Sequence, residues 1–206
     1  MTSEPLLSVQ GLALQRGGEP LLHALDFTLA AGELLWLRGP NGRGKTSLLR
    51  VLAGLARPEA GTIAWRSGGL PLYLAHANAL KDDLSAREAL AFLARLHGAA
   101  SGDAELLVAL RRFGMQAACE RPVRTLSQGQ RRRVALARLA LQDEARVWLL
   151  DEPFDALDAQ GVEIACALIA SRLHAGGGVI LTSHVPPQVP GIELRELDLE
   201  RAEVRA

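Results

Sequence analysis

A glycine-rich segment at residues 39–47 constrains this chain more than any other feature. Residues 39–46 fit the template G-x-x-x-x-G-K-[ST], in which glycines allow positive φ angles and bring backbone N–H groups close to phosphate oxygens. Residues 33–37 predict a strand before the segment, and residues 46–55 predict a helix after it, whose N-terminal dipole favours an anion. This order predicts a nucleoside triphosphate as the ligand, rather than a chance glycine-rich turn.

The segment at residues 39–47, here called the phosphate loop, supplies the first candidate binding residues. Lys45 would place a point charge at the β- and γ-phosphates, and the Thr46 hydroxyl would be a ligand of Mg²⁺. The candidate nucleotide-binding residues of the loop are Gly39, Pro40, Asn41, Gly42, Arg43, Gly44, Lys45, Thr46 and Ser47.

The composition is that of a globular protein with no net charge. Of 206 residues, 49% are apolar and 22% are charged, and Lys plus Arg equal Asp plus Glu at 23 each. Balanced charge gives no reason to expect a nucleic-acid partner, and the length predicts one domain spanning residues 1–206.

Neither a signal peptide nor a membrane-spanning segment is expected. The first residues lack a positive region followed by an apolar core, and no apolar stretch approaches the roughly 18 residues that span a bilayer. We therefore expect a cytoplasmic protein whose action at a membrane would pass through a partner.

The residue pattern predicts an α/β fold with a helical insert. Apolar runs that predict strands lie at residues 6–30, 62–65, 71–74, 147–150 and 179–182. Helical spacing occurs at residues 85–114, 126–141 and 161–174. The prediction is a P-loop NTPase core with a β-rich N-terminal part and an inserted α-helical subdomain at about residues 80–140. Alternating apolar residues at 192–199 predict a closing β-ribbon.

Two adjacent carboxylates end one of the buried strands. Residues 149–153 are Leu-Leu-Asp-Glu-Pro, and ligands of α/β sheets gather at the carboxyl ends of strands. We predict that Asp151 helps to hold Mg²⁺ through water. Glu152 is predicted to orient and polarise the water that attacks the γ-phosphate.

A second phosphate-recognition surface lies where the predicted helix at residues 126–141 begins. Ser127 and Gly129 offer a hydroxyl and unhindered N–H groups, with Gln128 and Gln130 beside them. One nucleotide cannot readily use both surfaces of a single fold. The order of phosphate loop, this signature segment (residues 126–130) and the acidic strand end resembles the ATP-binding subunits of ABC transporters over essentially the whole chain.

The resemblance implies roles for further residues. Asp155 and Asp158 resemble the ends of the family's D-loop (residues 155–158), and His184 resembles its switch histidine, which is expected to contact the γ-phosphate. In the family two domains pack head to tail, so that ATP and Mg²⁺ held by one copy are covered by the signature segment of the other. The expected activity is ATP hydrolysis that requires a dimer, with Glu152 and His184 as catalytic residues.

Two positions depart from the family pattern. The aromatic residue that usually stacks on adenine is replaced near Arg16, whose planar guanidinium could stack instead, so weak base selectivity is expected. The glutamine that usually links the nucleotide to the transport partner falls at Ala77, which leaves His76 or Asn78 as substitutes.

Three consecutive arginines, at residues 131–133, follow the signature segment. Such a run can bind nucleic acid or anionic lipid, but three charges without interleaved aromatic residues make a poor nucleic-acid site. We interpret the run as the solvated face of the helix and expect no nucleic-acid partner.

Several features of this chain resemble one branch of the family, the ATP-binding subunits of cytochrome c maturation systems, which are haem-exporter ATPases. These features are the compact length and the sequences at residues 74–76, 122–127 and 134–139. The resemblance implies a peripheral subunit on the cytoplasmic face of a bacterial inner membrane, bound to an integral membrane permease subunit. Its ATP hydrolysis would drive haem export or release of a haem-loaded chaperone. Direct haem binding is not expected, because the chain has no C-x-x-C-H motif.

Two alternative functions remain open at this point. One is the ATPase subunit of another small-substrate ABC transporter, since the membrane partner chooses the substrate. The other is a P-loop metabolite kinase, which would need neither the signature segment nor His184.

Overall fold

The structure is a computed structural model that describes residues 4–66, 71–96, 101–141 and 146–200. Its contacts divide the chain into two compact units. The first unit is formed by Met1–Tyr73, Ala145–Glu152 and Ile169–Ala206, and the second by Leu74–Glu144 and Pro153–Leu168.

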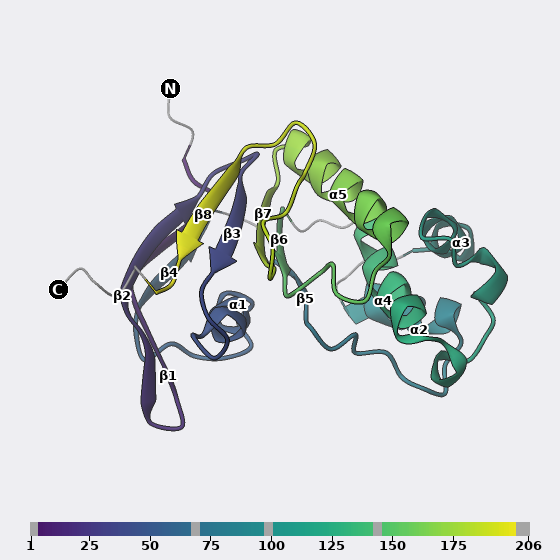
Figure 1. Ribbon diagram of the computed structural model, residues 1–206, viewed down its shortest axis with the longest axis horizontal. Coiled ribbons are helices and arrows are strands. Elements are labelled where there is room, and N and C mark those ends of the chain that lie inside the picture. Colours follow the sequence, from purple (N-terminus) through teal and green to yellow (C-terminus); the bar gives the residue numbers. More distant parts are fainter. Residues whose placement is uncertain (1–3, 67–70, 97–100, 142–145, 201–206) are drawn as a thin grey trace. The chain divides into compact units, whose positions relative to one another are not determined.

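An antiparallel sheet of the first unit contains the N-terminal strands, in the order β2-β1-β4. The strands are β1 (Leu7–Arg16), β2 (Glu19–Leu29) and β4 (Ala60–Trp65), shown in Figure 1. Gly17 and Gly18, between β1 and β2, have φ angles of 61° and 86°, which glycine adopts without a steric penalty. The predicted β-rich N-terminal part and its turn are therefore confirmed.

The second sheet has the strand order β5-β6-β7-β3-β8. Its strands are β3 (Leu34–Arg38), β5 (Leu72–Leu74), β6 (Val147–Leu150), β7 (Gly178–Thr182) and β8 (Leu194–Asp198). In parallel pairing, β3 lies between β7 and β8, and β6 lies next to β7. Every residue of β6 and β7 is buried, which confirms the prediction of parallel strands covered on both faces.

The predicted closing β-ribbon at residues 192–199 is wrong. Within the described residues this segment forms the single strand β8, which pairs in parallel with β3 from Leu34 opposite Leu194 to Arg38 opposite Asp198. Figure 1 shows the two strands side by side. Alternation of apolar residues reports a half-buried strand, but it does not report which strand is its neighbour.

One helix of the first unit follows β3 after the phosphate loop. It is α1 (Lys45–Leu52), which packs its buried face, Leu48, Leu49, Val51 and Leu52, into a core shared with the leucines of β1, β2 and β3. Because these apolar residues lie at helical spacing, burial of one face fixes α1 against the sheets.

The second unit is mainly helical. Its helices are α2 (Ala86–Leu96), α3 (Asp103–Arg112) and α4 (Gln128–Ala137), with short 3-10 turns at Gln116–Ala118, Val123–Thr125 and Arg138–Ala140. The long helix α5 (Ala159–His174) begins in this unit and ends in the first. These helices lie where helical spacing predicted them, and the grouping of residues 80–140 as a subdomain of one domain stays a prediction.

Candidate active site

The phosphate loop connects β3 to α1 and depends on its glycines. Gly42 and Gly44 have φ angles of 84° and 95°, which residues with side chains adopt only at a cost. A Cβ atom on Gly44 would also lie 3.3 Å from the Cβ of Leu21. The helix begins directly after Gly44, and the first N–H groups of a helix have no partner within it. The loop therefore has the backbone conformation that an anion-binding turn needs, and phosphate binding by its residues stays a prediction.

Lys45 folds back over the phosphate loop. Its Nζ donates hydrogen bonds to the carbonyl oxygens of Gly39 at 2.6 Å and Pro40 at 3.0 Å. The same three residues line a cavity of about 590 Å³ together with His184. This volume is in the range of small-molecule sites, and the lining also includes the carboxylates of Glu196, Asp198 and Glu200.

Asp151 is a buried carboxylate at the end of β6, with only 2% of its surface exposed. Its Oδ2 accepts a hydrogen bond from Thr46 Oγ1 at 2.9 Å, and its Oδ1 accepts one from Thr182 Oγ1 at 2.8 Å. The structure thus brings together the two residues predicted to hold Mg²⁺. A carboxylate beside a hydroxyl oxygen is a hard donor set that fits this ion. Burial, with a smaller effect of the Asp151 charge, raises the pKa of Tyr73 on β5 to about 12.

Glu152 has a left-handed backbone with φ of 47°, which is uncommon for a residue other than glycine. Its N–H donates a hydrogen bond of 2.8 Å to Thr182 Oγ1, the same hydroxyl that donates to Asp151. Thr182 is fully buried, so one side chain fixes both members of the acidic pair. Sequence analysis did not select Thr182 as a site residue. A residue with a hydroxyl group at the end of an apolar strand is the sequence signal that could have identified Thr182.

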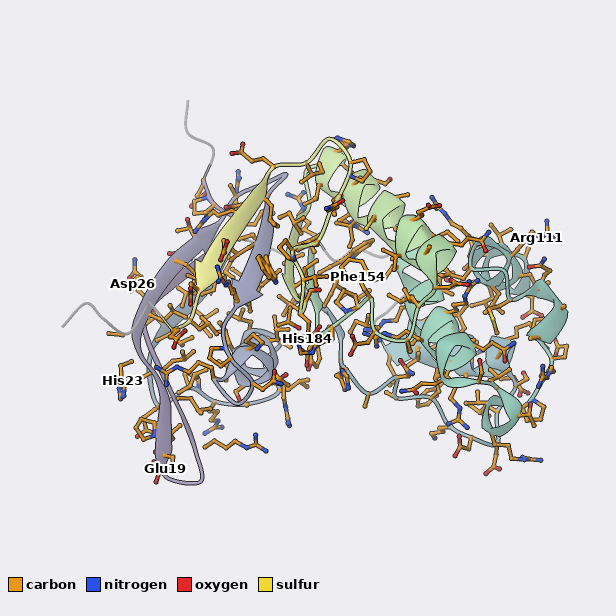
Figure 2. The ribbon with its side chains drawn as sticks, in the orientation of Figure 1. Glu19, His23, Asp26, Arg111, Phe154 and His184 are labelled. Atoms are coloured by element: carbon orange, nitrogen blue, oxygen red, sulfur yellow. The ribbon has the colours of Figure 1, made fainter. Side chains whose placement is uncertain are left out.

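His184 lies just beyond the end of β7, where Figure 2 labels it. Its Nε2 is 3.9 Å from Oε1 of Glu152, so the structure brings the two predicted catalytic residues together. The segment is held by Trp36 of β3, whose Nε1 donates a hydrogen bond of 3.1 Å to the carbonyl oxygen of Ser183. Trp36 was also missed, because an apolar strand predicts burial and not the use of an indole N–H.

In the second unit, the signature segment opens α4 with a reciprocal cap. The Ser127 hydroxyl accepts a hydrogen bond from the Gln130 N–H at 3.2 Å, and the Gln130 side chain accepts one from the Ser127 N–H at 3.0 Å. A Cβ atom on Gly129 would lie 2.8 Å from the carbonyl oxygen of Ala156. The predicted helix start at Ser127 is confirmed, and the D-loop packs directly on the glycine.

Asp158 connects the D-loop to two helices. Its carboxylate accepts a hydrogen bond of 2.9 Å from the Gly161 N–H in α5 and binds the guanidinium of Arg133 in α4 at 2.6 and 2.7 Å. These partners, the Gly161 N–H first, hold the pKa of Asp158 below its usual value. Ser127, Gly129, Arg133 and Asp158 line a cavity of about 310 Å³. The signature segment and the D-loop therefore form one connected block of the second unit.

The interpretation of residues 131–133 as a solvated face is wrong. Arg132 is 2% exposed and binds the side chain of Asn78, and Arg133 binds Asp158. Consecutive residues of a helix point in different directions, so neighbouring arginines cannot share one face. The three guanidinium groups bind acceptors on other segments of the second unit.

The two positions that depart from the family pattern lie on separate units. Arg16 is exposed at the end of β1, opposite Glu19, and its stacking on a base stays a prediction. Ala77 lies between the two proposed substitutes. His76 Nδ1 is 3.6 Å from Asp155 Oδ2, and Asn78 accepts a hydrogen bond from Arg132.

The predicted site residues divide between the units. The phosphate loop, Asp151, Glu152 and His184 belong to the first unit, and the signature segment and D-loop belong to the second. Within the described residues, no helix combines the length and apolar character needed to cross a membrane.

Comparison with known proteins agrees with this geometry. The ABC transporter family matches residues 22–155. The cytochrome c biogenesis ATP-binding export protein CcmA of Albidiferax ferrireducens is 43% identical, over 97% of this chain and 99% of that protein. The protein of the same name from Pseudomonas putida is 45% identical, over 94% and 96%.

Solved structures show the same fold. An ABC transporter ATP-binding protein from Pyrococcus furiosus has a TM-score of 0.79 at 25% identity, covering 95% of this chain and 98% of that one. An ATP-binding cassette solved as a dimer in a post-hydrolysis state, with ADP and phosphate bound, has a TM-score of 0.78 at 22% identity and covers 94% of each chain. The predicted α/β fold is therefore confirmed.

Proposed function

Because this chain belongs to the ABC transporter family, among the cytochrome c biogenesis ATP-binding export proteins, we propose that it is the ATP-hydrolysing subunit of an exporter serving cytochrome c biogenesis. The similarity to these relatives extends over nearly the full length of both chains. The observation that carries the ATPase activity is the network in which Thr182 binds both Asp151 and Glu152, with Thr46 of the phosphate loop on the other oxygen of Asp151.

ATP would bind with its phosphates on the phosphate loop. The N–H groups at the start of α1 would donate to phosphate oxygens, and the helix dipole favours the negative charge. Lys45 Nζ donates to two carbonyl oxygens of the loop, and it would exchange these acceptors for oxygens of the β- and γ-phosphates when ATP binds. Arg16 would contact the base.

Hydrolysis would be carried out by the acidic pair and the switch histidine. Thr46 and Asp151 would hold Mg²⁺, which when bound neutralises charge that develops on the phosphate oxygens. Glu152 would accept a hydrogen bond from the attacking water and orient it, because the bond from its N–H to Thr182 and its left-handed backbone fix the point from which its side chain projects. His184, 3.9 Å from Glu152, would donate a hydrogen bond to the γ-phosphate.

We further propose that a second copy of the chain completes each site. Ser127 and Gly129 present a hydroxyl and N–H groups at the start of α4, which is a second anion-binding helix start in a chain that already has one at α1. The D-loop, with Asp155 and Asp158, would move with this block, since it packs on Gly129 and binds Arg133. A head-to-tail dimer gives both helix starts of each chain a phosphate to bind.

We propose that the membrane partner of this chain is a permease. An integral membrane subunit would dock the chain on the cytoplasmic face of a bacterial inner membrane and would choose the substrate. Haem or a haem-loaded chaperone would be handled by that subunit, without direct haem contact to this chain. The second candidate is the ATPase of another small-substrate exporter, and co-purification with its permease distinguishes the two.

Complementation of a deletion strain tests the role. A strain lacking the gene should show no covalently bound haem on c-type cytochromes in a haem-stained gel, and the wild-type gene should restore it. Glu152→Gln should fail to restore haem attachment, whereas Glu163→Gln, on the exposed face of α5, should succeed. Normal haem staining in the deletion strain would contradict the role in cytochrome c biogenesis, and loss of restoration by both variants would contradict the assignment of Glu152.

A further inference from the structure

Arg132 is the most enclosed charged side chain of the basic run on α4. Only 2% of its surface is exposed, although the residue lies between two arginines with more accessible side chains. A buried guanidinium is costly unless hydrogen-bond acceptors surround it. Its burial therefore depends on the groups that it binds.

The acceptors of Arg132 come from two separate segments. On one side, its Nη1 donates to the carbonyl oxygens of Ala75 at 3.1 Å and His76 at 3.4 Å, and to Asn78 Oδ1 at 3.0 Å. On the other side, its Nε donates to the carbonyl oxygen of Pro153 at 3.3 Å. One planar group thus connects residues 75–78 to the peptide that follows Glu152 in the chain.

The connected segment is the one in which Ala77 replaces the glutamine of the family pattern. A second contact joins the same segment to the D-loop, since His76 Nδ1 is 3.6 Å from Asp155 Oδ2. Residues 75–78 are therefore linked through Arg132 to Pro153, and they lie next to Asp155 of the D-loop. Arg132 also lies in the helix that begins at the signature segment.

We propose that Arg132 is a positioning residue that performs the linking task of the missing glutamine. A displacement of residues 75–78 is transmitted through its guanidinium to the backbone after Glu152 and to the signature helix. Asn78 takes part as the side-chain acceptor. This inference rests on the proposed ATPase function, because its effect is on the rate at which bound ATP is hydrolysed.

The fork geometry of arginine is essential to this role. Arginine presents several N–H donors in one plane and can bind both segments at once, whereas lysine has a single ammonium group on a flexible stem. Arg132→Lys keeps the charge and removes the bridge. The loss of the bridge should lower kcat by about tenfold. Because ATP binding depends on the phosphate loop, KM for ATP should stay within about twofold.

The test compares variants of the full chain in its assembled transporter. Steady-state ATPase assays give kcat and KM for wild type, Arg132→Lys, Asn78→Ala and the double variant, with Arg111→Lys, an exposed residue of α3, as the matched control (Figure 2). Hydrogen exchange of the peptide that contains residues 75–78 is measured on the same proteins. Asn78→Ala removes one acceptor and keeps Arg132, so it tests the link even where Arg132→Lys impairs folding.

The expected result is lower kcat with unchanged KM for both single variants, and faster exchange at residues 75–78. The double variant should be no slower than Arg132→Lys alone, because both changes break the same link. Arg111→Lys should behave as wild type.

A different outcome would overturn the inference. If the exchange increases while kcat per nucleotide site stays at the wild-type value, Arg132 only supports the structure. If the single effects add in the double variant, Asn78 and Arg132 do not act as one link. A wild-type transporter that neither binds nor hydrolyses ATP would contradict the proposed function, whereas an active wild type with an equally active Arg132→Lys protein contradicts this inference alone.

Discussion

The Thr182 hydroxyl offers the sharpest test of how the acidic pair is held. Thr182→Val replaces the hydroxyl with a methyl group of nearly the same size, so the buried volume at the end of β7 hardly changes. The substitution removes the donor to Asp151 Oδ1 and the acceptor of the Glu152 N–H, both at 2.8 Å. Any effect therefore reports these two hydrogen bonds.

The expected cost follows from burial. A hydrogen bond to a charged group contributes about 1.5–3 kcal/mol, and a buried N–H that loses its partner costs about 1–3 kcal/mol. We expect Thr182→Val to lower the free energy of unfolding by about 3 kcal/mol, or Tm by about 6–12 °C for a chain of this size. Thr182→Ser keeps the hydroxyl and loses one buried methyl group, which costs about 1 kcal/mol.

Thermal unfolding by circular dichroism, combined with ATPase assays, measures both consequences. Because Thr182 also fixes Glu152, the valine variant should lose about tenfold in kcat, and the serine variant should keep most of it. Equal Tm values for wild type and the valine variant, or an equal loss in the serine variant, would refute the argument that the hydroxyl holds the acidic pair.

The remaining predictions concern the loop, the signature segment and pH. Lys45→Ala should weaken ATP binding by about 10–100-fold in isothermal titration calorimetry, because a charge-assisted hydrogen bond is lost; unchanged affinity would contradict the role of Lys45. Gly129→Ala places a Cβ atom 2.8 Å from the Ala156 carbonyl oxygen, so it should cost about 1–3 kcal/mol in chemical unfolding and reduce ATPase activity, and a neutral effect would show that the D-loop contact is loose. The pKa of Tyr73 rises to about 12 on folding, so the unfolded chain loses its phenol proton first, and stability should fall between pH 10 and about 12. Tyr73→Phe should remove this part of the alkaline loss, and identical pH profiles would contradict it.

Much of the site could be predicted because its chemistry depends on local sequence order. The glycines and Lys45 of the phosphate loop, the carboxylates of Asp151 and Glu152, and the cap at Ser127 follow from a strand end or a helix start. Such features depend only on residues that are neighbours in the sequence, so a local pattern is enough to predict them.

The residues that sequence analysis missed or misinterpreted act across long separations in the chain. Trp36 binds the carbonyl oxygen of Ser183, and Arg132 binds residues 75–78 and Pro153. Strand β8 pairs with β3 from the far end of the chain. Partners of this kind are set by packing of the whole chain, and a local pattern of apolar or charged residues cannot identify them.

We propose that the phosphate loop of one copy is completed by the signature segment of another. Size-exclusion chromatography with light scattering on Glu152→Gln, with ATP and Mg²⁺, tests it directly, because this variant would bind ATP without hydrolysing it. We predict a change from the monomer mass of 22.0 kDa to twice that value, and a monomer for Glu152→Gln/Ser127→Arg even though it still binds ATP. A Glu152→Gln protein that stays monomeric with saturating ATP, or a dimer that persists when Ser127 is replaced by arginine, would contradict the claim.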